Sequence, residues 1–252
     1  LHAPFNNVKI RQAAMLALGH GRQGDVIVVS RVPWISYNWG PYGIGANVMW
    51  APGRPEEAWS YSEEGIRACV AEAARSGRKV AGIVITSPDN PTGQTLTLER
   101  QIALGRAALE AGVAFVLYDW MYHAVSDGEG SDVNALLRAF EPELRNRIMV
   151  LDGITKCLGG SNIRNCHLLA PEAVVKMIVA QSSHTVIPSF FSLAVAMAAY
   201  EKGLQEAAAP IILPTRESRA WLRTYLKEKG LKHIIGQGYY AFINVAESLQ
   251  GK

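Results

Sequence analysis

The stretch TSPDNPTG, residues 86–93, marks the point where an apolar segment gives way to a turn. It follows the run KVAGIVI at 79–85, which predicts a buried strand, while its two prolines and its glycine predict a stiff turn. Such a turn presents Asn90 at the carboxyl end of the strand. Asn90 is then either an amide that binds a ligand or an ordinary residue of an Asn-Pro turn.

Four further runs share this short, apolar character, and several are apolar on both faces, which is typical of a buried and mostly parallel sheet. They are DVIVVS (25–30), ANVMW (46–50), VAFVLY (113–118) and RIMVLD (147–152). Helical patterns occupy 61–77 and 97–112 between the runs, and 171–182, 190–204 and 214–229 after them. Alternation of strands and helices predicts an α/β fold with three layers.

The best candidate for a domain boundary is the segment from Pro210 to Pro214. We therefore expect a large domain over residues 1–209 and the beginning of a smaller C-terminal α+β domain over 210–252. The second part would contain a long helix and the strand YYAFINV at 239–245.

Composition narrows the class of protein. The chain has 252 residues, of which 49% are hydrophobic and 19% charged, as in an ordinary soluble globular protein. The net charge is +3 and no basic block occurs, which argues against nucleic acid and anionic membranes as partners. No apolar run has the length of a membrane span. Three cysteines without metal-ligand spacing indicate reduced thiols, so a cytoplasmic location is the default expectation.

Ligands of such sheets bind beyond the carboxyl ends of the strands, so the residues that follow each run matter most. Lys156 follows the run 147–152 in an uncharged, glycine-rich setting. It is either a surface lysine or an amine that can act as a nucleophile or form a Schiff base. Arg164, eight residues later, either pairs with a surface acid or binds a phosphate with its guanidinium fork.

Asp119 directly follows the run 113–118, where a buried carboxylate needs a hydrogen-bonding or cationic partner. It either caps a local turn or pairs with a protonated ring nitrogen. Tyr122, three residues later, can face the same pocket and donate to an oxygen of that ring. Trp34 is either a core residue or an aromatic surface on which a flat cofactor stacks.

The motifs DNPTG, DWMY and TKCLGGSNIR, in this order and at these spacings, resemble those of fold-type-I pyridoxal-phosphate-dependent aminotransferases of the class I/II superfamily. VPWISY is similar to their PYWVSY-type segment, and QGDVIVVS to their PGDEVLVP strand. The resemblance covers the chain from about residue 10 to its end. It implies the mostly parallel three-layer sheet of their large domain and the cofactor pyridoxal 5'-phosphate.

The resemblance also implies roles for single residues around this cofactor. Lys156 would form a Schiff base with the cofactor aldehyde, and Asp119 would keep the pyridine nitrogen protonated. A protonated pyridine withdraws electrons from the substrate Cα, and the released lysine amine could then move a proton. Tyr122 and Asn90 would donate hydrogen bonds to the ring oxygen O3′.

Three further residues complete the implied cofactor site. Trp34 would stack on the pyridine ring, and Arg164 would bind the phosphate together with the hydroxyl of Thr155. Gly153 departs from the pattern, because many relatives have a serine there that contacts the phosphate. The segment SSHTVIPSFFS at 182–192 also departs from it, and its His184 is either structural or a residue of substrate selection or proton transfer.

We expect the family's N-terminal arm, most of its small domain and its substrate-binding arginine to lie outside this sequence. The first functional hypothesis is an aminotransferase acting on an α-amino acid and a 2-oxo acid, as a homodimer with sites between the subunits. The second is another reaction of the same cofactor, by a lyase or an oxygen-dependent oxidase or hydroxylase. The third is a non-catalytic fragment that binds the cofactor. The sequence does not identify the amino acid.

Overall fold

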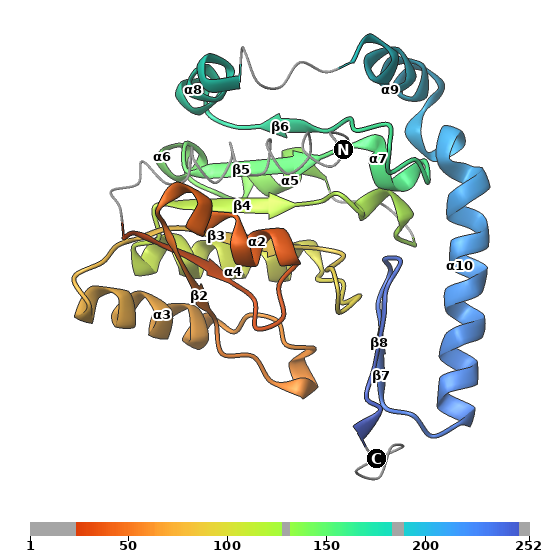
Figure 1. Cartoon of the computed structure of the whole chain (residues 1–252), viewed down its shortest axis with the longest axis horizontal. Coiled ribbons are helices and arrows are strands. Elements are labelled where there is room, and N and C mark those ends of the chain that lie inside the picture. Colours follow the sequence, from red (N-terminus) through yellow and green to blue (C-terminus); the bar gives the residue numbers. More distant parts are fainter. Residues whose placement is uncertain (1–23, 128–131, 183–188, 247–252) are drawn as a thin grey trace.

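A computed structural model describes residues 24–127, 132–182 and 189–246, and its centre is a six-stranded sheet of order β2-β1-β3-β4-β5-β6 (Figure 1). The first five strands pair in parallel, and β6 runs antiparallel to β5. The strands are β1 (Val26–Val29), β2 (Asn47–Trp50), β3 (Val80–Thr86), β4 (Phe115–Asp119), β5 (Ile148–Asp152) and β6 (His167–Leu169).

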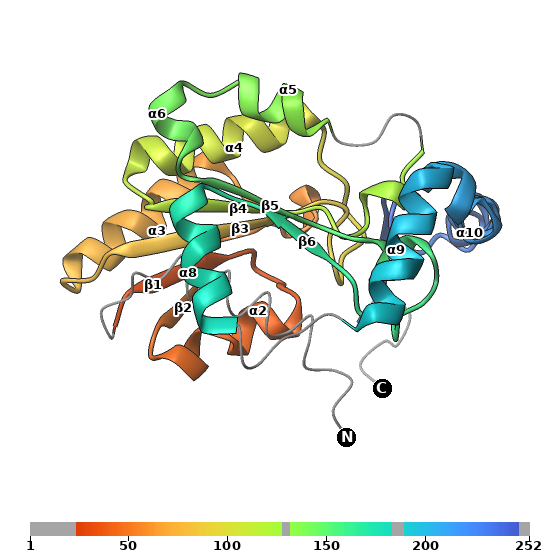
Figure 2. The same ribbon diagram turned by 90° about the horizontal axis from the view of Figure 1, so that it is seen from above.

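Helices cover both faces of the sheet, so the predicted three-layer α/β fold with a mostly parallel sheet is confirmed (Figure 2). The helices are α2 (Ile35–Trp39), α3 (Glu63–Arg75), α4 (Leu98–Ala111), α5 (Val133–Arg138), α6 (Pro142–Arg145), α7 (Ile154–Cys157), α8 (Glu172–Ser182), α9 (Phe190–Lys202) and α10 (Leu204–Glu228). Short 3₁₀ turns are η1 (Pro41–Ile44), η2 (Pro55–Glu57) and η3 (His123–Val125).

Alternate residues of the strands enter two separate cores. Val26 and Val28 of β1 pack with α3, α4 and α5, whereas Ile27 and Val29 pack in the cluster that contains residues of α2, α8, α9 and α10. This division follows from the period of two in a strand, which points successive side chains to opposite faces. Both faces are covered, which explains why the predicted strands are apolar throughout.

Local signals account for the ends of the two central helices. Ser62 caps α3 by accepting a hydrogen bond from the Gly65 amide at 3.0 Å, and Thr97 caps α4 in the same way. Gly112 ends α4 in the left-handed conformation, with φ of 101°.

Helix α10 corrects the expected structure around Pro210 and Pro214. Both prolines lie inside one helix that begins at Leu204, not in a break before a helix that begins at 214. A proline removes a backbone hydrogen bond and crowds the preceding turn. The buried side chains of Ala208 and Ile212 hold the helix to the core across this segment. The division into residues 1–209 and 210–252 remains a prediction.

A two-stranded antiparallel hairpin follows α10, formed by β7 (His233–Ile235) and β8 (Ala241–Ile243). Its second strand lies within the predicted strand 239–245. Figure 1 shows α10 and the hairpin on the side of the sheet where α7 follows β5. They therefore stand next to the edge at which the parallel strands end.

Within the described part of the chain, no helix combines the length and apolar character needed to cross a membrane.

Gly105 tests how tightly α4 packs on the sheet. A Cβ atom at this position would lie 1.9 Å from the hydroxyl oxygen of Tyr118, which is fully buried and bonded to the Gln101 carbonyl at 3.2 Å. Alanine is favoured over glycine in helices by about 1 kcal/mol, but overpacking costs about 1–3 kcal/mol. We expect Gly105→Ala to lower the free energy of unfolding in urea. Gly43→Ala, with no atom within 4 Å of the added Cβ, is the control. A stabilised Gly105→Ala protein would contradict this packing.

Candidate active site

Three neighbouring strand ends bring the predicted site residues to one edge of the sheet. Thr86 of β3 pairs with Asp119 of β4, and Asp119 pairs with Leu151 of β5. The turn with Asn90 follows β3, Asp119 itself ends β4, and Lys156 lies in α7 just after β5. Because parallel strands end together, residues far apart in the sequence meet here.

Tyr122 is the centre of a hydrogen-bonded group. Its ring is buried, and its hydroxyl receives a hydrogen bond from the Asn90 amide Nδ2 at 3.3 Å. The hydroxyl of Tyr240, from the hairpin, lies 2.8 Å from the same oxygen. The structure therefore brings the side chains of Asn90 and Tyr122 together and adds the phenol of Tyr240 to them.

Asp119 is only 2% exposed, and hydrogen-bond donors hold both oxygens of its carboxylate. The hydroxyl of Tyr37 donates to Oδ2 at 2.6 Å, and the amide of Met121 donates to Oδ1 at 3.1 Å. Hydrogen bonds of this kind stabilise a buried negative charge and fix its orientation. Trp34 packs edge-on against Tyr37, with ring centroids 5.3 Å apart, so it belongs to the same corner of the site.

Lys156 lies in the short helix α7 beside Tyr122. Its Nζ is 5.9 Å from the centre of the Tyr122 ring, within the range of a cation–π contact. Its backbone carbonyl accepts a hydrogen bond from the hydroxyl of Tyr239 at 2.7 Å. Both the amine and the backbone of this residue are thus in contact with aromatic side chains of the site.

Thr155 and Arg164 are linked through the backbone of Asn165. The buried Thr155 hydroxyl donates to the Asn165 carbonyl at 2.9 Å and accepts from the Asn165 amide at 3.1 Å. Arg164 has a left-handed backbone with φ of 56°, which is rare outside glycine, and its Nη1 donates to the Ser161 carbonyl at 2.8 Å. The only proton of the Thr155 hydroxyl is therefore already used within the protein.

Close contacts explain why position 153 is a glycine. A Cβ atom there would lie 2.6 Å from the carbonyl oxygen of Asn165 and 2.7 Å from the Cα of Cys166. A serine would thus push away the segment that follows Arg164. Close approach of two backbones, rather than loss of a function, explains why the residue before α7 has no side chain.

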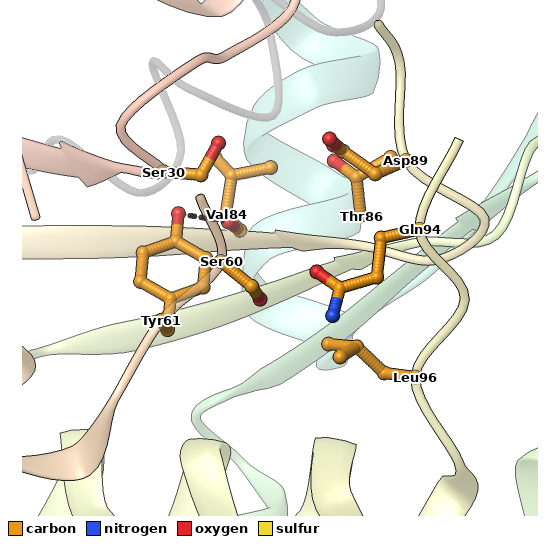
Figure 3. A pocket seen from close by; sticks show the side chains of 8 residues that line it. All are labelled: Ser30, Ser60, Tyr61, Val84, Thr86, Asp89, Gln94 and Leu96. Carbon is orange, nitrogen blue, oxygen red and sulfur yellow. Dashed lines mark hydrogen bonds between the residues drawn. The ribbon is translucent and has the colours of Figure 1, made fainter. Parts of the chain in front are cut away.

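Asp89, next to Asn90, lies at a small cavity of about 10 Å³, which has room for about one water molecule (Figure 3). Polar side chains from several segments line this cavity: Ser30, Ser60, Tyr61, Thr86 and Gln94. Burial raises the pKa of Asp89 to about 6, although the Thr92 hydroxyl donates to its Oδ2 at 2.5 Å and opposes this rise. Asp89 therefore carries a poorly solvated charge directly behind the turn that presents Asn90.

Sequence reasoning missed Tyr37, Asp89 and Tyr240, and the signal for each was weak. Tyr37 stands three residues after Trp34, which precedes the short helix α2 that contains Tyr37. Asp89 lies inside the motif that singled out Asn90. Nothing near Tyr240 in the sequence indicates a partner 118 residues away. His184 lies outside the described residues.

Asp89→Asn tests the partly buried charge. The pKa of Asp89 is about 6 in the folded protein, against an ordinary value of 3.8, so at neutral pH the folded state bears the cost of an ionised, partly buried carboxyl. This cost disappears as the pH falls through 6 towards 4. We expect the amide to stabilise the protein at pH 8 by up to about 3 kcal/mol and to give no gain at pH 4. Urea unfolding at both pH values measures the difference, and an equal gain at both would contradict the assignment.

Tyr37→Phe tests the support of the Asp119 carboxylate. The variant removes one charge-assisted hydrogen bond from a buried group, which costs about 1.5–3 kcal/mol. We expect a loss of that size in the free energy of unfolding at pH 7. The matched control is Tyr42→Phe, on a ring that is 45% exposed. Equal stability of the two variants would show that the Tyr37 hydroxyl contributes nothing there.

Comparison with known proteins shows which sequences and structures this chain resembles. Over 237 residues the chain is 27% identical to the aspartate/prephenate aminotransferase of Nitrosomonas europaea, covering 90% of this chain and 55% of that protein. It is 25% identical over 185 residues to the aspartate aminotransferase of Geobacillus stearothermophilus, covering 73% and 44%. The chain thus spans about half the length of these relatives.

Among solved structures, a mutant aspartate aminotransferase of Thermus thermophilus superimposes with a TM-score of 0.77 at 22% identity, over 95% of this chain and 63% of that one. The aspartate aminotransferase of Rhizobium meliloti gives a TM-score of 0.76 at 23% identity, over 92% and 56%. At this identity the likeness establishes the fold. The family model described as aminotransferase class I and II matches residues 9–250, and the chain belongs to this family.

Proposed function

We propose that this chain binds pyridoxal 5'-phosphate and that the protein transfers the amino group of an α-amino acid to a 2-oxo acid. One observation carries the proposal: the amine of Lys156 lies 5.9 Å from the centre of the Tyr122 ring, whose hydroxyl is bonded to Asn90. An amine, a phenol and an amide thus converge at the strand ends. The buried carboxylate of Asp119 lies at the end of β4, which pairs with both β3 and β5.

The side chains present fit the chemistry of this cofactor. Its aldehyde needs a primary amine, its ring nitrogen an anionic acceptor, its ring oxygen hydrogen-bond donors, and its phosphate a cation. Lys156, Asp119, Tyr122 with Asn90, and Arg164 supply these groups in that order. When bound, pyridoxal phosphate supplies an aldehyde that condenses with amines and a ring that withdraws electrons from the substrate Cα.

Asp119 would hold the ring nitrogen, because its carboxylate is already oriented by Tyr37 and the Met121 amide. A preorganised buried carboxylate favours a protonated nitrogen without reorganising during the reaction. Trp34, packed on Tyr37, would supply a flat surface for the ring.

Lys156 would act as the base that takes a proton from the substrate Cα and delivers it to carbon C4′ of the cofactor. Its Nζ lies beside the Tyr122 ring at the edge where the strands end, which places the amine for this proton transfer. The hydrogen bond from Tyr239 to its carbonyl fixes the start of the side chain.

Arg164 would bind the phosphate through its guanidinium, and the geometry changes the role we propose for Thr155. The phosphate offers mainly acceptors, whereas the Thr155 hydroxyl proton is used on the Asn165 carbonyl. We therefore assign Thr155 to holding the backbone next to Arg164 in its left-handed conformation.

The names of the relatives support transfer of an amino group, and no observation favours a lyase, an oxidase or a non-catalytic fragment. We further propose a homodimer, supported by the large apolar side chains that α9 exposes, among them Phe190 at 87% and Phe191 at 71%. The three free cysteines support a reducing compartment such as the cytoplasm.

Lys156→Ala tests the proposal directly. We expect the wild-type chain to gain a visible absorbance band with pyridoxal phosphate, and the variant to gain none that survives gel filtration, because the amine that forms the Schiff base is gone. Lys176→Ala, at an exposed lysine of α8 paired with Glu172, is the matched control. A wild-type chain that never becomes coloured, or a coloured Lys156→Ala chain, would overturn the proposal.

Asp119→Asn tests the role of the carboxylate. We expect the variant to bind the cofactor but to transfer amino groups at least about a hundredfold more slowly, since the amide cannot stabilise a positive ring nitrogen. The rate of amino-group transfer is measured with an amino acid and a 2-oxo acid acceptor, in the form of the protein whose wild type is active. A wild-type rate in the variant would exclude the assigned contact with the ring nitrogen.

A further inference from the structure

The hairpin β7–β8 touches the site through two adjacent tyrosines. The Tyr240 hydroxyl lies 2.8 Å from that of Tyr122, and the Tyr239 hydroxyl donates to the Lys156 carbonyl at 2.7 Å. Both rings also pack edge-on against the Tyr122 ring, with centroids 5.5 and 6.1 Å away. One hairpin thus contacts the side chain of Tyr122 and the backbone of Lys156, two residues on which the proposed chemistry depends.

The backbone of the hairpin lies directly on the turn that presents Asn90. A Cβ atom on Gly93 would come within 2.3 Å of the Tyr240 carbonyl oxygen, and one on Gly236 within 1.8 Å of the Gly93 carbonyl oxygen. The Gln237 amide donates to Oγ1 of Thr95 at 2.8 Å. Two glycines therefore allow the hairpin and the turn to meet backbone to backbone.

Arg219 of α10 joins this hairpin to the loop that follows Tyr122. Its buried guanidinium directs one nitrogen, Nη1, at the carbonyls of Gln237 and Gly238 in the hairpin and at the carbonyl of Val125, 3.0 Å away, so these three acceptors share its two protons. Asp127 neutralises the charge, at 2.7 Å from Nη2. A guanidinium suits this task because it presents several donors in one rigid plane.

We propose that Arg219 is a positioning residue that clamps the hairpin against the site, so that Tyr240 orients the hydroxyl of Tyr122 towards the cofactor. This inference deepens the proposed function and rests on it for the identity of the cofactor. The clamp itself rests only on contacts within the protein.

The orientation follows from counting protons. The Tyr122 oxygen carries one hydrogen and already accepts a bond from the Asn90 amide. Either hydroxyl of the Tyr122–Tyr240 pair could be the donor, and we assign Tyr240 to that role. With Asn90 and Tyr240 both donating to the Tyr122 oxygen, the hydrogen of Tyr122 points away from both, and the chain of hydrogen bonds strengthens Tyr122 as a donor to the ring oxygen of the cofactor.

The first experiment measures hydrogen exchange of the hairpin amides in the full chain without cofactor. Arg219→Lys keeps the charge but loses the fork, and we expect exchange over residues 233–243 to become at least about tenfold faster. Arg216→Lys is the matched control, because Arg216 also pairs with Asp127, at 3.0 Å, but donates to the Ser126 carbonyl and not to the hairpin. Unchanged hairpin exchange in Arg219→Lys would overturn the clamp.

The second experiment follows the bound cofactor. Tyr240→Phe leaves the ring but removes the hydroxyl, so Tyr122 becomes a weaker donor to the ring oxygen. We expect the pH midpoint of the cofactor absorbance change to rise by about half a unit to one unit. Tyr225→Phe, on an exposed ring of α10 that stacks on Trp221, should keep the wild-type midpoint. A wild-type midpoint in Tyr240→Phe would overturn the role of Tyr240.

Gly236→Ala provides a second route, because its methyl group would lift the hairpin without changing Arg219 or either tyrosine. We expect fast hairpin exchange and the same raised midpoint, so the proposal stays testable if Arg219→Lys does not fold. Normal exchange and a normal midpoint in Gly236→Ala would count against it. If the wild-type chain binds no pyridoxal phosphate, the proposed function fails, while the exchange experiment still decides whether Arg219 clamps the hairpin.

Discussion

Parallel hydrogen bonding between β3, β4 and β5 is the constraint on which the site depends. Parallel strands all end at one edge of the sheet, so the segments that follow them must share the space beyond that edge. The register pairs Thr86 with Asp119 and Asp119 with Leu151, which brings Asn90, Tyr122 and Lys156 to neighbouring positions. A shift of one residue in this register would turn Asp119 to the opposite face of the sheet.

A buried carboxylate at a strand end is costly unless the fold satisfies it, and here tertiary contacts do so. Tyr37 comes from α2, which lies between β1 and β2 in the chain, and its hydroxyl reaches Asp119 at 2.6 Å. The same helix begins after Trp34, which packs on Tyr37. The groups that stabilise the carboxylate thus lie beside the residue that we propose as the stacking surface.

The C-terminal part of the chain contributes side chains that contact the site. Helix α10 carries Arg219, the hairpin carries Tyr239 and Tyr240, and glycines at the contact let two backbones approach closely. The glycine that closes the opening motif, Gly93, therefore has a packing role towards the hairpin besides its positive φ of 76°. Local turn chemistry and long-range packing act on the same residue.

By itself the sequence determined the five parallel strands, the two long helices between them and the residues at the strand ends, because apolar periodicity and turn residues are local signals. It also indicated Asn90, Asp119, Tyr122 and Lys156 as neighbours. The helical course through Pro210 and Pro214 depended on packing against the core, which no local signal reports. The bonds from Tyr37 to Asp119 and from Tyr240 to Tyr122 span 82 and 118 residues, so only the tertiary structure decided them.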